Sequence, residues 1–159
     1  MANSAKKSFD IFSAPDYLDE LVRPAYADFI KDALSSRKAI TCVVFAWHLS
    51  DWIWAQHKTE LQKNPGLKKK RDYIQFLFAK CPELEVLQDL ANGSKHFKND
   101  QSTVEDTKLS HGHASGLLLA FTQSHLIVRT GKATYFIENL LEKVIANCDA
   151  FFATYLTPH

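Results

Sequence analysis

The feature that most constrains the fold is one long stretch of helical periodicity, from about Arg37 to about Leu61. Ser35 or Ser36 supplies an N-cap before it, and the turn Asn64-Pro65-Gly66 ends it. Apolar residues recur along the stretch at the spacing of a helix that turns one face to a core. They are Ile40, Val43, Val44, Trp47 and Trp54. A chain of 159 residues organised around such a helix predicts a single domain with a helical core.

The same spacing predicts shorter helices before and after this segment. Ser13, with Asp16 three residues later, forms an approximate capping box, and Pro24 should kink or restart the helix that follows. Further helices are expected from Lys68 to Lys80, from Pro82 onward, and from about Tyr135 to the end. Residues 1–12 are expected to form a flexible N-terminal arm, and residues 13–159 the domain itself.

The pattern changes between the fourth and the last of these helices. The short apolar runs Gly116–Phe121 and His125–Arg129 favour strands, and Thr130-Gly131 favours a tight turn. The polar stretch Asn99–Ser110 is expected to be a loop. The predicted fold is therefore mainly α: a bundle of four to five helices with a small antiparallel β-hairpin, at about residues 115–133, before the last helix.

Composition and missing motifs exclude several classes of function. The net charge of +1 gives no whole-protein attraction to nucleic acid or anionic membranes. The longest apolar run, Ala39–Trp47, is far shorter than the roughly 20 residues of a membrane span. There is no apolar leader, and the three cysteines are widely spaced, so a cytoplasmic protein is expected. With five glycines and no glycine-rich phosphate loop, neither a nucleotide nor another cofactor is expected.

Two polar segments lie where apolar residues would be expected. In the first, His48 and Asp51 stand three residues apart on one helix face among three tryptophans, so Asp51 could orient the His48 ring. In the second, Asp89, Asn92 and His96 form a polar stripe beside Lys95. If the two helices face each other, these side chains form one cluster able to bind an anion or perform acid–base chemistry. Packing of a paired His48 and Asp51, and a simple helix end at Gly93, are the structural alternatives.

The runs AWHLSDW and DLANGSKHF resemble a group of small bacterial and phage-type proteins. The broad layout is also similar to the HEPN superfamily of helical bundles, which includes RNA-cleaving toxins and host-defence nucleases. The resemblance implies RNA as the partner, a homodimer as the assembly, His96 as the acid–base group, and Asn92 and Lys95 as phosphate-positioning residues. The arginine of the HEPN signature is absent, since position 91 is Ala, and Lys95 lacks the bidentate geometry of arginine.

Three other interpretations stay open at this stage. His111 and His113, with His125 in the expected strand, are weak candidates for a zinc or nickel site in a metal-binding bundle. The basic run Lys68–Arg71 either contacts phosphate or is a solvated helix start. The protein could also be a non-catalytic module that binds a partner or a second copy of itself through exposed aromatic residues. The residues do not decide whether the chain is an enzyme.

Overall fold

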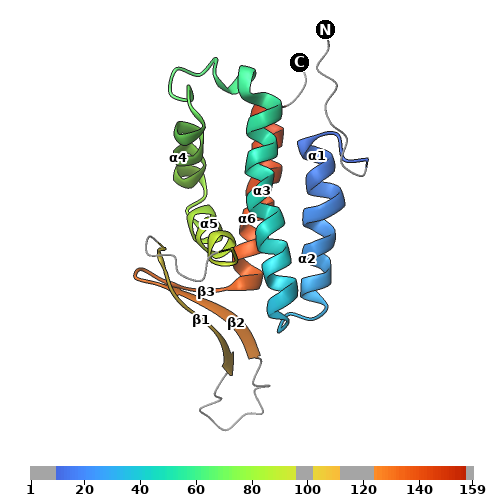
Figure 1. Ribbon diagram of the computed structural model, residues 1–159, viewed down its shortest axis with the longest axis vertical. Coiled ribbons are helices and arrows are strands. Elements are labelled where there is room, and N and C mark those ends of the chain that lie inside the picture. Colours follow the sequence, from blue (N-terminus) through green and yellow to red (C-terminus); the bar gives the residue numbers. More distant parts are fainter. Residues whose placement is uncertain (1–9, 96–101, 112–123, 157–159) are drawn as a thin grey trace.

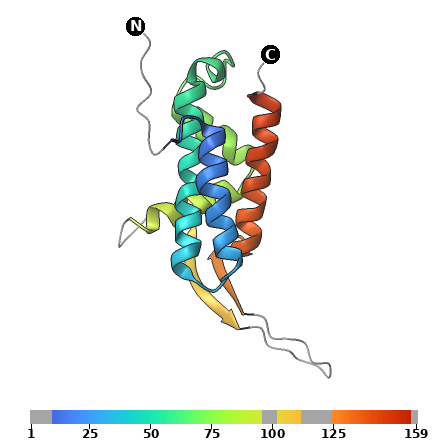
Figure 2. The same ribbon diagram turned by 90° about the vertical axis from the view of Figure 1, so that its right-hand side faces the viewer.

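The computed structural model describes residues 10–95, 102–111 and 124–156, which form a mainly helical bundle with an antiparallel sheet at one end. Figure 1 shows the long helix α3 (Ser36–Leu61) beside α6 (Ile137–Tyr155), with α2 (Arg23–Ile30) on one side and α4 (Lys70–Lys80) and α5 (Glu83–Gly93) on the other. The sheet lies across the foot of the bundle in Figure 1 and in the side view of Figure 2. The predicted fold class is confirmed.

The first helical segment, residues 14–30, begins and bends where its sequence predicts. The short helix α1 (Ala14–Tyr17) begins at Ser13, whose hydroxyl accepts a hydrogen bond from the Asp16 backbone N–H at 3.1 Å. A π-helical turn, Leu18–Val22, then precedes α2, which carries Pro24 near its start. Proline cannot donate to the preceding turn, so the wider turn falls where a kink is expected. Ile11 is buried against the helical core, and residues 1–9, which make up most of the expected arm, lie outside the described residues.

Helix α3 is the central element, and its bounds match the expected ones within one residue. Ser35 is its N-cap, with its hydroxyl 3.4 Å from the Lys38 backbone nitrogen. The helix buries Cys42, Val43 and Leu49, all at 1% exposure or less, in a single cluster of apolar side chains to which every helix contributes. Burial raises the pKa of the Cys42 thiol to about 12, so this cysteine is an inert core residue at neutral pH.

The strands β1 (Val104–His111), β2 (Ser124–Thr130) and β3 (Thr134–Phe136) pair antiparallel in that order. The expected strand over His125–Arg129 and the turn at Thr130-Gly131 are confirmed by β2 and its connection to β3. The expected loop at Asn99–Ser110 is wrong, because most of it is β1, so the sheet extends beyond the predicted hairpin bounds. The other expected strand, residues 116–121, lies outside the described residues.

The sequence pattern did not predict β1, because β1 is an edge strand at the foot of the bundle. Its side chains from Glu105 to Leu109 are exposed on both faces, so it lacks the alternation of apolar and polar residues that marks a half-buried strand. A register shift between Val104 and Asp106 interrupts the pairing further. Across the part of the chain that the structure describes, the helices are too short or too polar to traverse a lipid bilayer.

Candidate functional site

A groove of about 420 Å³ brings the first polar segment of the sequence together with the basic run. Helices α3, α4 and α5 form its walls. The residues that line it are Trp47, Asp51, Lys70, Arg71, Ile74, Gln75, Phe78 and Gln88. Its size falls in the range of roughly 300–1,000 Å³ that is usual for small-ligand sites. We call it the polar groove.

The turn before α4 is tied down so that the basic run lies at the mouth of this groove. Lys68 Nζ donates to the Gln62 carbonyl, and Gln62 Nε2 donates to the Lys68 carbonyl, both at 2.7 Å. The Asp72 carboxylate then accepts from the backbone N–H of Lys69 at 3.0 Å, which caps the first turn of α4. A helix start carries partial positive charge, so the four consecutive cations of the basic run strengthen the positive field there.

One of these cations meets the first polar segment directly. Lys70 Nζ lies 2.7 Å from Asp51 Oδ1, and both side chains are about half exposed. Arg71 is exposed and makes no ion pair in the part of the chain that the structure describes. The groove therefore has an ion pair that joins α3 to α4 and, next to Lys70 on α4, a guanidinium that can bind an anion.

Aromatic side chains form the apolar part of the groove. Trp47 and Phe78 approach with ring centroids 6.3 Å apart and a 33° angle between their planes. Just beyond, Trp54 stacks on Tyr73 at 5.4 Å, which anchors α4 to α3. The Tyr73 hydroxyl is buried and has no hydrogen-bond partner among the described residues, and burial raises the pKa of Tyr73 well above its usual value. This phenol is therefore a structural group.

The expected hydrogen bond between His48 and Asp51 is absent from the structure. Asp51 points its carboxylate at Lys70 on the neighbouring helix instead. His48 is half-buried on α3, one residue after Trp47, and the residues that line the polar groove do not include it. Helical spacing places two side chains on one face, but a cation on another helix can compete for the carboxylate.

The second polar segment divides into a structural part and a part at the helix end. Asp89 is 9% exposed, and its Oδ2 accepts from the backbone N–H of Thr103 at 2.5 Å and from the Thr103 hydroxyl at 2.6 Å. This carboxylate fastens α5 to the residue before β1. Asn92 is half-buried and Lys95 is exposed, and the Asn92 carbonyl accepts from the Lys95 N–H at 3.0 Å. His96 lies outside the described residues.

Gly93 is explained by the helix end alone. A Cβ placed there would meet nothing within 4 Å, so no close backbone or ligand requires a glycine. Helix α5 ends at Gly93 and is capped by Ser94, whose hydroxyl donates to the Ala91 carbonyl at 2.6 Å. The helix therefore ends at the Asn-Gly pair, as the alternative of a simple helix end expects, and Ser94 in the right-handed region is the C-cap residue.

The histidines of the metal hypothesis are only partly described. His113 and the side chain of His111 lie outside the described residues. His125 Nδ1 is hydrogen-bonded to Glu138 Oε1, and its ring packs on Phe136 with centroids 4.6 Å apart. Among the described residues no group of three or more potential ligands is arranged to hold a metal ion.

Sequence reasoning missed the α4 and α5 walls of the polar groove. Gln75 and Gln88 are ordinary polar residues on amphipathic helices, and nothing in their spacing marks them. The basic run and the Trp47–Asp51 segment are the two sequence signals that lie on this face. Comparisons with known protein families, with curated proteins and with solved structures find no match.

Proposed function

We propose that the protein binds single-stranded RNA through the polar groove. The observation that carries the proposal is that Arg71 and Lys70 lie across one groove from the Trp47–Asp51 segment. Cations at a helix start favour the phosphate backbone, which supplies most of the affinity of a protein for nucleic acid. The half-buried Phe78 ring and the amide side chains beside it favour an unpaired base rather than a free phosphate.

The few positive charges at the groove favour an anionic ligand but predict only moderate affinity for it. Asp51 offsets one cation, so Arg71 and the exposed Lys69 supply the remaining positive charge. With so few phosphate contacts, we expect weak binding that declines as salt rises. Gln75 and Gln88 are amide donors and acceptors able to pair with a base edge.

The HEPN-like role in RNA cleavage, with His96 as the acid–base group, remains a prediction. Asn92 and Lys95 lie at the end of α5 that leads toward His96, while the polar groove is lined from the same helix by Gln88. Binding and cleavage are therefore separable steps: the groove would hold the strand, and a group near the end of α5 would act on it.

The test is fluorescence anisotropy with a labelled single-stranded oligouridylate at low salt. Arg71→Gln should weaken binding about 3- to 10-fold, the loss of one charge-assisted phosphate contact. Arg129→Gln is the matched control, because Arg129 is an exposed arginine on β2, away from the groove. Binding that is absent in the wild type, or equal in the two variants, would refute the proposal.

A further inference from the structure

A second pocket, of about 340 Å³, lies between α3 and the sheet, with walls of a different kind. The residues that line it are Leu34, Ser36, Ala39, Ile40, Val43, Leu90, Thr107, Lys108, Leu109, Leu126, Ile127, Val128 and Ile137. Ten of the thirteen are apolar, and none is acidic. We call it the apolar pocket.

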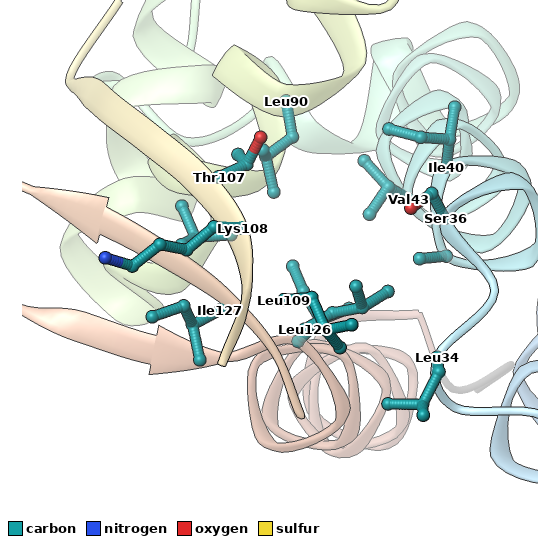
Figure 3. Close-up of a pocket in the computed structure, with 13 residues that line it drawn as sticks. Leu34, Ser36, Ile40, Val43, Leu90, Thr107, Lys108, Leu109, Leu126 and Ile127 are labelled. Atoms are coloured by element: carbon teal, nitrogen blue, oxygen red, sulfur yellow. The ribbon is translucent and has the colours of Figure 1, made fainter. Parts of the chain in front are cut away.

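The pocket is a real concavity with an apolar rim rather than a gap in the core. In Figure 3, Leu109 and Leu126 of the sheet and Val43 of α3 point toward the same space, while Lys108 extends away from it. Leu34, Ile40 and Leu109 remain 47%, 38% and 42% exposed. Three large exposed apolar side chains around one opening mark a binding surface more often than chance placement does.

The start of α3 forms one side of the pocket. Ser36, in the pocket wall, is the first residue of α3, a 26-residue helix whose first turn contains no acidic side chain. Arg37 follows it, exposed and without an ion pair among the described residues, and Lys38 is paired with Asp32 at 3.1 Å. Ser36 therefore brings the N–H groups and the positive dipole end of α3 to the pocket wall, and the exposed Arg37 follows it in the chain.

We propose that the apolar pocket binds a small amphipathic acid, with its hydrocarbon body between α3 and the sheet and its carboxylate at Ser36 and Arg37. The volume equals that of about eleven water molecules at roughly 30 Å³ each, which suits an aliphatic chain of about ten heavy atoms. The hydrocarbon supplies affinity through burial, and the helix start distinguishes an anion from a neutral or cationic head.

Isothermal titration calorimetry with hexanoate, octanoate and decanoate tests the hydrocarbon part of the proposal. Affinity should rise about fourfold per added methylene, the value of one buried CH₂, until the pocket is full. Octan-1-ol should bind more weakly than octanoate, and octylamine more weakly still. Affinity that does not depend on chain length, or octylamine binding as tightly as octanoate, would overturn the proposal.

Two variants locate the site. Leu109→Asp places a negative charge at an exposed rim position and should weaken octanoate binding at least about tenfold, since it removes apolar contact and repels the carboxylate. Arg37→Gln should weaken it about two- to fivefold and needs no repacking. Lys132→Gln, in the exposed turn between β2 and β3, is the control and should not change it.

The alternative occupant is a second copy of the chain, and sedimentation distinguishes it. A dimer that Leu109→Asp dissociates, in a protein that does not bind octanoate, would overturn the small-acid proposal in favour of self-association. Unchanged octanoate affinity in both Leu109→Asp and Arg37→Gln would also overturn it. RNA binding through the polar groove uses other residues, so its failure leaves these outcomes unaffected.

Discussion

Two pockets meet the same helix within one turn of each other, yet they differ in character. Val43 of α3 lines the apolar pocket, and Trp47, four residues later, lines the polar groove. Helix α5 separates them, since Leu90 contributes to the apolar pocket and Gln88 to the polar groove. Residues four apart on a helix share a face, so α3 alone does not create this difference. The elements packed against α3 create it: the sheet on one side and α4 on the other.

The comparison teaches that a polar residue within an apolar stripe is a visible signal, whereas a pocket made of ordinary apolar residues is not. Asp51 stood out in the sequence because a charge interrupts the buried face of α3. Ile40 looks like a core residue in the sequence and Leu109 lies in a stretch expected to be a loop, and only their exposure around one pocket makes them part of a candidate site.

The largest loss of stability is expected from a substitution in the buried core of α3, the helix that lines both pockets. Leu49 is fully buried in α3, and Leu49→Ala should lower the free energy of unfolding by about 2–5 kcal/mol, because it leaves a cavity in the core. Urea denaturation measures this loss, and both binding activities should weaken with it. Ile30→Ala, at a 46% exposed position that lines neither pocket, is the control and should cost less than about 1 kcal/mol. Equal losses in the two variants would contradict the described core.

Removing the hydrogen bonds that join the sheet to α5 should weaken ligand binding in the apolar pocket more than in the polar groove. Asp89→Ala removes both hydrogen bonds to Thr103 and should cost about 1–3 kcal/mol in urea denaturation. Because Asp89 holds the start of β1, octanoate binding should fall while oligouridylate binding is retained. Asp106→Ala, on the exposed strand, is the control. A variant that loses only RNA binding would show that Asp89 belongs to the polar groove instead.

A histidine in the C-terminal half of α3 should make the stability of the fold decrease at acidic pH. Burial lowers the pKa of His57, an effect that Glu60 partly opposes, and His57 Nε2 is buried with no hydrogen-bond partner in the part of the chain that the structure describes. The unfolded chain therefore binds a proton first as the pH falls below about 6.5, so stability should decrease there and should not change above it. His57→Gln should reduce the loss between pH 7.5 and pH 5.5 in urea denaturation. An identical pH dependence in both proteins would exclude His57 as its source.

The smallest effect on stability, and a selective one on function, is expected at the ion pair. The Asp51–Lys70 pair is half exposed, so Asp51→Asn should change the free energy of unfolding by less than about 1 kcal/mol. The released Lys70 should strengthen oligouridylate binding about two- to fivefold and leave octanoate binding unchanged. Asp106→Asn is the charge-matched control on the sheet. Weaker RNA binding in Asp51→Asn would mean that Asp51 itself contacts the ligand.

Most helix positions could be predicted from the sequence because their signals are local. Ser13, Ser35 and the Asn92-Gly93 pair mark helix ends through hydrogen bonds within a few residues, and the structure has helix ends at all three. The sheet was only partly predictable. β2 carries buried apolar residues, whereas β1 is exposed on both faces and depends on pairing with β2 for its conformation.

The candidate sites divide in the same way. By itself the sequence determined the helical class, the place of the β element before the last helix, and the unusual polarity of the Trp47–Asp51 segment. Only the tertiary structure decided that Asp51 pairs with Lys70 rather than with His48, that Asp89 holds β1, and that an apolar pocket opens between α3 and the sheet. Helix caps and periodicity are interactions over a few residues, but the partner of a side chain depends on which distant elements pack beside it.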